Sequence, residues 1–281
     1  MSVLSPGGSG QMTSRYQLVA IDLDGTIINK DGAIVSGAAE AIRRVLARGI
    51  AVTLATGRMY QPTNRFAHEL GLSAPLICYQ GALIREPGDG AVLWHKPLPG
   101  PLARRVLTVM REQGLHRYAY IDGSIYVEQR REEDSRYAQN NGVELHLVDD
   151  LSALLERQPT ELAARGDAAE VELLIARIRA VCGSGVIVNR IHTSFCEVAH
   201  GESGKGNALK YLAERLAVPR SRTVAIGDSP NDVSMLEWAG LGIAVGDVPA
   251  EVRTAADWVI DNGAEDSFGE AVARLLDCSE G

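Results

Sequence analysis

The stretch VAIDLDGTIIN, residues 19–29, decides the fold, because an apolar run there ends on two aspartates one residue apart. Residues 17–22 are apolar and partly β-branched, which predicts a buried strand. The segment 36–49 has the apolar spacing of a helix, with Ser36 as a possible N-cap and Gly49 as its stop. A strand that feeds a helix is the repeating unit of an α/β fold.

The same alternation of strand and helix returns along the chain, which predicts a doubly wound parallel sheet with right-handed crossovers. Further strands are expected at 50–56, 75–81, 223–228, 241–245 and 257–260. Helices are expected near 60–70, 204–217, 231–240 and 266–276, with a short one between the last two strands.

The middle of the chain has a different rhythm. A hairpin is predicted around the turn PGDG (87–90), and Pro97, Pro99 and Pro101 punctuate a junction after it. Short alternating strands and two helices then predict an α+β insert whose mainly antiparallel sheet is covered on one face. The predicted organisation is a flexible tail (1–14), a core domain (15–83 and 196–281) and an inserted cap domain (84–195).

Composition excludes several classes of function. The formal net charge is -8 over 281 residues, and binding to nucleic acid or to an acidic membrane needs clustered positive charge instead. The first residues lack the features of a signal peptide, and no apolar run is long enough to span a bilayer. Four cysteines, at 78, 182, 196 and 278, form no C-x-x-C pair and are expected to be free thiols. A soluble, cytoplasmic protein is expected.

Polar residues gather where the predicted parallel strands end, which is where such sheets bind ligands. They are Asp22 and Asp24, Thr56 and Arg58, Gln80, and Asp228, Asn231 and Asp232, with Lys205 at the start of a helix. Several carboxylates in one crevice repel each other unless a cation lies among them. A hard divalent ion, most plausibly Mg2+, fits oxygen ligands and would recruit a phosphate. Lys205 and Thr56 would donate to that phosphate, and Gly25 and Gly57 would let the backbone approach it.

Simpler interpretations stand beside this one. Asp228 and Asp232 could cap the following helix. Arg58 could contact substrate or pair with an acidic residue. The histidines His95, His192 and His200 have no metal-ligand spacing and are expected to be surface or packing residues. Four residues of the cap could face the site or simply pack the cap sheet: Tyr118, Tyr120, Tyr126 and Glu128. GESGKGN does not have the spacing of a phosphate-binding loop.

Four motifs in order, DLDGT, ATGR, GKGNAL and GDSPNDVSML, resemble the haloacid dehalogenase superfamily of phosphatases. The place of the insert, the YQGA segment and the GLGIAVGD segment resemble its Cof-type hydrolases, whose cap is a type IIB α/β domain. The resemblance covers nearly all of the chain after residue 15. It implies a Rossmann-like core and a phosphoric monoester hydrolase.

The resemblance also implies roles. Asp22 would be the nucleophile that carries an aspartyl-phosphate, and Asp24 the general acid and base. Thr56, Lys205 and Asn231 would hold the phosphoryl oxygens, near Gly57 and Arg58. Asp22, the backbone carbonyl of Asp24, Asp228 and, directly or from close by, Asp232 would hold Mg2+.

Two departures from the family pattern stand out. Relatives often have Asn-Gly where this chain has Gln80-Gly81, and ELAARGD (161–167) interrupts an apolar strand with Arg165, which predicts a poorly formed or shifted edge. The expected substrate is a small phosphomonoester, either a sugar phosphate, a nucleotide or a phosphorylated cofactor. A phosphomutase-like phosphotransferase and a non-catalytic phosphate-binding regulator remain alternatives.

Overall fold

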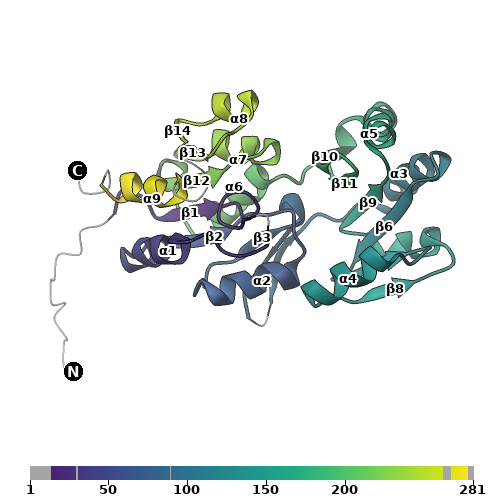
Figure 1. The fold of residues 1–281 in the computed structure, drawn as a ribbon, viewed down its shortest axis with the longest axis horizontal. Helices are drawn as coiled ribbons and strands as arrows, with labels where there is room; N and C mark the ends of the chain where they lie inside the picture. Colours follow the sequence, from purple (N-terminus) through teal and green to yellow (C-terminus); the bar gives the residue numbers. More distant parts are fainter. Residues whose placement is uncertain (1–13, 30, 89, 262–266, 278–281) are drawn as a thin grey trace, which may run out of the picture.

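The computed structural model of the chain describes residues 14–29, 31–88, 90–261 and 267–277. Residues 1–13 of the predicted tail, residue 266 of the predicted last helix, and Cys278 lie outside the described residues. Two units lie side by side, one built around a parallel sheet and one around a mixed sheet (Figure 1).

The larger unit contains a five-stranded sheet in the order β14-β13-β12-β1-β2. Every neighbouring pair in it is parallel, as the alternation of strands and helices predicts. The strands are short and buried because they lie between two layers of helices, so near-continuous apolar runs suit them. They are β1 (Leu18–Ile21), β2 (Ala51–Leu54), β12 (Thr223–Gly227), β13 (Leu241–Val245) and β14 (Trp258–Ile260).

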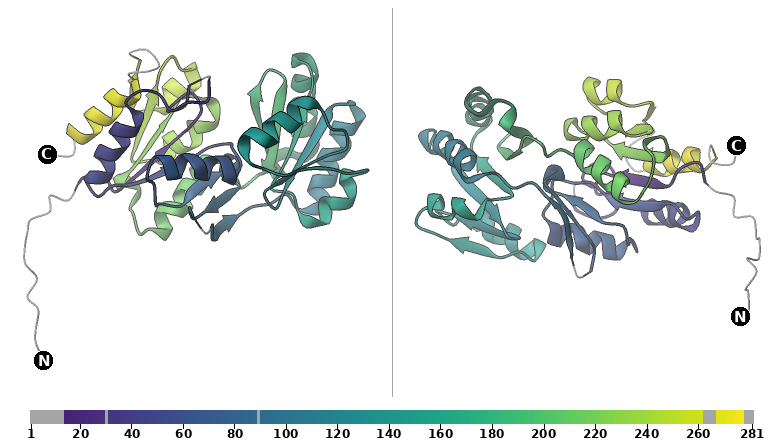
Figure 2. Two further views of the ribbon diagram at one scale, coloured as in Figure 1. Left: turned by 60° about the horizontal axis from the view of Figure 1, so that its bottom comes forward. Right: turned by 180° about the vertical axis from the view of Figure 1, so that it is seen from behind.

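Helices cover both faces of this sheet, which makes it doubly wound (Figure 2). One face carries α1 (Ala38–Ala47), α2 (Tyr60–Glu69) and α9 (Ser267–Asp277). The other carries α6 (Lys205–Arg215), α7 (Val233–Trp238) and α8 (Ala250–Ala255). The expectation that Ser36 is the N-cap of the first helix is wrong. Gly37, in a left-handed conformation, directly precedes α1, and no side chain caps this helix.

The third predicted strand differs from expectation. β3 (Leu76–Cys78) keeps one parallel bridge to the first sheet, between Ala55 and Ile77, but it pairs antiparallel with β4 (Leu83–Arg85). β5 (Val92–His95) completes this three-stranded sheet. The cause is local: Tyr79, Gln80 and Gly81 all have positive φ, so the chain reverses immediately after β3.

The smaller unit has a six-stranded sheet in the order β10-β11-β9-β6-β7-β8. It is antiparallel except between β7 and β8. α3 (Gly100–Glu112) and α5 (Ala168–Cys182) cover the face turned away from the larger unit, while α4 (Glu132–Asn141) lies on the other side (Figure 1). The strands are β6 (His116–Ile121), β7 (Ser124–Val127), β8 (Leu145–Leu147), β9 (Glu161–Arg165), β10 (Val186–His192) and β11 (Phe195–His200).

The expectation of a poorly formed edge at 161–167 is wrong. β9 is an inner strand, paired with β11 on one side and β6 on the other. Arg165 is tolerated because it lies at the end of the strand, where its guanidinium stacks over Phe195 and approaches Glu133 at 3.5 Å. Charge at a strand end reaches solvent without crossing the core.

The predicted boundary between residues 195 and 196 cuts through β11, which pairs with β10 and β9 of the smaller sheet. The β4–β5 hairpin, placed in the insert by the sequence, packs on α6 through Tyr211, whose hydroxyl donates to the Leu93 carbonyl at 2.8 Å. We therefore propose that the inserted cap runs from about residue 98 to His200. In the part of the chain that the structure describes, no helix has the length and apolarity to cross a membrane.

The inner position of β9 generates a stability prediction. Leu162 is fully buried between the sheet and the helices α3 and α5, so Leu162→Ala should lower the free energy of unfolding by about 2–5 kcal/mol. Leu147→Ala, at an exposed position of β8, should change it by less than about 0.5 kcal/mol. Urea unfolding followed by circular dichroism compares the two variants. Equal stability of Leu162→Ala and the wild type would contradict a buried inner strand.

Candidate active site

The predicted site residues meet at the carboxyl ends of β1, β2 and β12. Asp22 directly follows β1, and its backbone N–H donates to the Ile226 carbonyl of β12 at 2.9 Å. Thr56 follows β2, and Asp228 follows β12. Parallel strands end at one edge of a sheet, so side chains some 200 residues apart in sequence converge without any special loop.

Three carboxylates and one lysine form a buried cluster. Asp22, Asp228 and Asp232 each offer an oxygen, and these oxygens lie within 4.8 Å of one another. Lys205 Nζ donates to Asp22 Oδ1 at 2.5 Å and to Asp232 Oδ1 at 2.6 Å. Lys205 is 1% exposed, so water does not screen the attraction between its ammonium group and the two carboxylates.

The cluster is rich in negative charge. Burial, with repulsion from Asp232, raises the pKa of Asp22 well above its usual value, and the same two causes raise the pKa of Asp228 to about 6. Burial also acts to lower the pKa of Lys205, but attraction to Asp22 and Asp232 outweighs it and raises that pKa. One lysine against three carboxylates leaves a deficit of positive charge that a divalent cation would balance.

The donor set fits a hard divalent cation, because every ligand on offer is a carboxylate oxygen. The turn after β1 lies close against one of these carboxylates. Gly25 has φ of +90°, and a Cβ atom there would lie 2.4 Å from Asp228 Oδ2, so only glycine allows this approach. The Thr26 hydroxyl donates to Asp228 Oδ1 at 2.8 Å and fixes the orientation of that carboxylate.

Asp232 makes the capping contacts that the sequence raised as an alternative, and it also contacts Lys205. Its Oδ2 accepts from the backbone N–H groups of Asp228 and Ser229, each at 3.0 Å, which is a local capping arrangement. Its Oδ1 accepts from Lys205. Asp228 forms no such cap, since its own carboxylate accepts from Thr26.

Asp24 and Arg58 form a bidentate ion pair. Arg58 Nε donates to Asp24 Oδ2 at 2.8 Å, and Arg58 Nη2 donates to Asp24 Oδ1 at 2.5 Å. The Asp24 side chain is 54% exposed, in contrast to buried Asp22. Arg58 is therefore the partner of an acidic residue, one of its two predicted roles, and that residue is the predicted acid and base.

Gln80 lies between the two units at the site, where the sequence predicted a polar residue at a strand end that departs from the family pattern. It is 2% exposed, its N–H donates to the Thr56 carbonyl at 3.1 Å, and its side chain fills the space beside Gly57. Gln80 Oε1 accepts from Asn231 Nδ2 at 2.9 Å, and Gln80 Nε2 donates to Glu197 Oε2 of the smaller unit at 3.1 Å. Gln80 thus links the two units.

A cavity of about 1040 Å³ lies between the two units. On the core side its lining includes Asp22, Asp24, Thr56, Gly57, Arg58, Gln80 and Asn231. On the cap side it includes Tyr118, Tyr120, Tyr137, Glu161, His192, Phe195 and Glu197. Of these cap residues, sequence reasoning had raised only the two tyrosines of β6 and His192. The period-two placement of Glu161 and Glu197 on strands facing the core was the signal available for the two acids.

The other residues in question pack elsewhere. The Tyr126 ring stacks on His146 at 4.8 Å, and Glu128 pairs with Arg111 and Arg117. His95 contacts the Thr160 hydroxyl at 3.0 Å, and His200 Nδ1 accepts from the Glu202 N–H. Among the described residues, no histidine joins the group of possible metal ligands.

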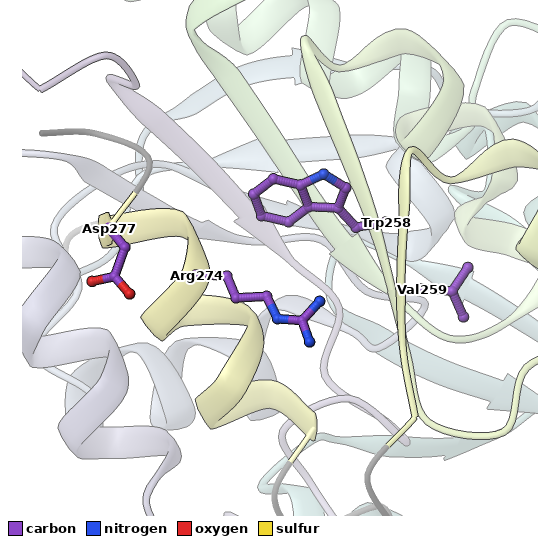
Figure 3. A pocket seen from close by; sticks show the side chains of 4 residues that line it. All are labelled: Trp258, Val259, Arg274 and Asp277. Atoms are coloured by element: carbon purple, nitrogen blue, oxygen red, sulfur yellow. The ribbon is translucent and has the colours of Figure 1, made fainter. Parts of the chain in front are cut away.

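A second pocket, of about 470 Å³, lies between β14 and α9 and is lined by Trp258, Val259, Arg274 and Asp277 (Figure 3). The Arg274 guanidinium is paired with Glu270 one helical turn earlier. The pocket lies away from the aspartate cluster, and its lining includes none of the predicted site residues. It is therefore not the candidate active site.

The fold and site together define a class of protein, a doubly wound α/β domain whose charged site faces an inserted cap. The family model of haloacid dehalogenase-like hydrolases matches residues 19–272, and the chain belongs to this family. The predicted superfamily, fold class and enzyme class, a phosphoric monoester hydrolase, are thereby confirmed, with support from curated phosphatase relatives.

One curated relative is the pyridoxal phosphate phosphatase YbhA of Escherichia coli, 26% identical over 276 residues that cover 94% of this chain and 100% of the relative. A solved haloacid dehalogenase-like hydrolase from Bacteroides thetaiotaomicron superimposes with a TM-score of 0.81 at 26% identity, covering 92% of this chain and 99% of that one. A solved subclass IIB sugar phosphatase shares the fold with a TM-score of 0.78 at 19% identity, covering 92% and 98%.

The Lys205 contacts generate a second prediction. Lys205→Met leaves Asp22 and Asp232 buried without a counter-charge, so the free energy of unfolding in the absence of divalent ions should fall by about 3–5 kcal/mol. Lys210→Met, on the exposed side of the same helix, is the matched control and should change it by less than about 0.5 kcal/mol. Urea unfolding in the presence of a chelator measures both. An unchanged stability of Lys205→Met would show that the cluster is not held by this lysine.

Proposed function

We propose that this hydrolase is a Mg2+-dependent phosphatase that cleaves a small phosphomonoester through an aspartyl-phosphate intermediate. One observation carries the proposal: Asp22, buried at the end of β1 and held by Lys205, opens onto the cavity between core and cap. A buried, oriented carboxylate beside a cationic group is the arrangement that covalent catalysis by aspartate requires.

The chemistry we propose has two steps. A carboxylate oxygen of Asp22 forms a bond to phosphorus as the bond between phosphorus and the leaving oxygen breaks, and Asp24 gives that oxygen a proton. Asp24 then takes a proton from water as the water oxygen bonds to phosphorus. The bond between Asp22 and phosphorus breaks in the same step, which frees inorganic phosphate and regenerates the enzyme.

Asp24 must turn toward the substrate for these proton transfers, since its carboxylate is paired with Arg58. A substrate phosphate is an anion that Arg58 would bind in exchange for Asp24, because a guanidinium matches phosphate and carboxylate equally well. Arg58 and the Gly57 backbone would then contact substrate. Thr56, Lys205 and Asn231 would hold the phosphoryl oxygens in place.

Asp22, Asp228, Asp232 and the backbone carbonyl of Asp24 would hold Mg2+. When bound, the ion supplies Lewis-acid polarisation of a phosphoryl oxygen and neutralises part of the charge of the cluster. The all-oxygen donor set and the charge deficit of the cluster support this choice. The size of the cavity supports a small phosphorylated metabolite as the substrate. Pyridoxal phosphate, for which one curated relative is named, is such a metabolite.

Removal of the nucleophile tests the proposal directly. Asp22→Asn should lower the rate of phosphate release from p-nitrophenyl phosphate by about 10³-fold or more, because an amide does not form the phosphoenzyme. Asp31→Asn, an exposed position in the loop that follows, is the matched control and should keep wild-type activity. Circular dichroism establishes that both variants fold. Substantial turnover by Asp22→Asn would exclude it as the nucleophile.

Removal of metal tests the cofactor. Chelation with EDTA should abolish phosphate release, and added Mg2+ should restore it, because the cluster then regains its counter-charge. Mg2+ should also raise the melting temperature of the wild type by mass action, and raise it less for Asp228→Asn. Full activity after chelation would contradict a metal-dependent mechanism. A further assay contains an acceptor alcohol. Release of inorganic phosphate then indicates hydrolysis, whereas formation of the phosphorylated alcohol indicates phosphotransfer.

A further inference from the structure

Two glutamates of the cap face the proposed phosphoryl site from neighbouring strands. In the register of β11 and β9, Glu197 lies opposite Ala163, two residues along the strand from Glu161. Residues two apart on a strand share a face, so Glu161 and Glu197 are diagonal neighbours on the face opposite α3 and α5. Both line the large cavity.

Both carboxyl groups are buried at a cost to stability. Glu161 is 1% exposed and Glu197 is 9% exposed. Burial, reinforced by repulsion from Glu197, raises the pKa of Glu161 well above its usual value, and burial raises the pKa of Glu197 to about 7. Within the described residues, Glu161 Oε1 has no hydrogen-bond partner. A buried acceptor without a donor is destabilising, so its retention calls for a role outside folding.

The protein's own cations on the cavity wall are engaged elsewhere. Four arginines line the cavity, and each has a partner away from the two glutamates: Arg58 with Asp24, Arg165 with Glu133, Arg179 with the Val188 carbonyl and Arg190 with Glu172. The surroundings of the glutamates are aromatic instead. Tyr79, Tyr120 and Tyr137 line the cavity. The rings of Tyr79 and Tyr120 lie edge to face, with their centroids 6.1 Å apart. None of these side chains donates to Glu161 Oε1 in the structure, so a molecule bound in the cavity can supply the missing donor.

Hydrogen bonds also connect Glu197 to the proposed phosphoryl site. Its Oε2 accepts from Gln80 Nε2, and Gln80 Oε1 accepts from Asn231 Nδ2. The strained conformation of Gln80, with φ of 53°, is maintained by its buried position between these partners. Only the Gln80 side chain therefore separates Glu197 from Asn231, which is proposed to hold a phosphoryl oxygen. Glu197 is thus placed to contact the part of a phosphomonoester that lies beyond its phosphoryl group.

We propose that Glu161 and Glu197 bind the leaving group of the substrate, and that this group presents at least two hydrogen-bond donors to them, from hydroxyl or ammonium groups. The inference rests on the proposed phosphatase function and names the chemical class of its substrate. A leaving group without donors would leave the two buried carboxyl groups unpaired, and a site of this kind rejects such a substrate more strongly than an apolar pocket does.

The test compares three phosphomonoesters of similar size: glycerol 3-phosphate with hydroxyl donors, 2-aminoethyl phosphate with an ammonium donor, and propyl phosphate with neither. The wild type should show a kcat/KM for at least one donor-bearing ester about 10-fold to 100-fold above that for propyl phosphate. The better of the two identifies the donor. Equal or faster cleavage of propyl phosphate would overturn the inference.

Glu161→Gln and Glu197→Gln should each lower kcat/KM for the preferred ester by about 10-fold to 100-fold and change that for propyl phosphate by less than about 3-fold. Glu161→Gln should also raise the melting temperature by a few degrees, because the uncharged amide ends the repulsion from Glu197. Glu128→Gln, directly after β7 of the same sheet, is the matched control. Its carboxylate pairs with Arg111 and Arg117, so this change should lower the melting temperature and leave the selectivity unchanged.

Unchanged selectivity in both Glu161→Gln and Glu197→Gln, or a lower melting temperature for Glu161→Gln, would overturn the inference. The hydrolysis of p-nitrophenyl phosphate separates this failure from a failure of the proposed function. If the wild type cleaves that ester with Mg2+ but shows no preference for donor-bearing esters, only the inference fails. If the wild type releases phosphate from none of the four esters, the proposed function fails, and the inference with it.

Discussion

The rest of the site depends on the repulsion among three carboxylates gathered at one edge of a parallel sheet. Lys205 offsets part of it through short contacts to Asp22 and Asp232. These contacts join the loop after the first strand, the first residue of α6 and the loop after β12, so one buried ammonium group fixes the relative positions of segments 183 residues apart. The remaining negative charge is the feature that would favour a divalent cation at this site.

The insert leaves and re-enters the core at the edge of the sheet where the carboxylates lie. The chain departs after the β3–β5 sheet and returns just before Lys205, so both connections lie at the edge where the carboxylates meet. The cap sheet consequently turns one face toward Asp22 and buries the other under α3 and α5. A domain inserted at this edge covers the site without altering the parallel sheet beneath it.

Gln80 shows how closely the two units are joined. It lies between Asn231 of the core and Glu197 of the cap, in a segment where three successive residues have positive φ. Such conformations persist only when surrounding contacts hold them. The conformation that reverses the chain after β3 therefore also sets the distance between the phosphoryl site and the cap. The departure Gln80-Gly81 noted in the sequence is a point of contact between the units.

The sequence by itself determined the parallel core, the residues at its strand ends and the charge conflict among Asp22, Asp228 and Asp232, because apolar runs and motif order are local properties of the chain. Only the tertiary structure decided which partners those residues take. Arg58 pairs with Asp24, β9 is an inner strand in spite of Arg165, and Glu161 meets Glu197. Each of these outcomes depends on strand register or on the approach of one domain to the other, and the local pattern of residues along the chain encodes neither.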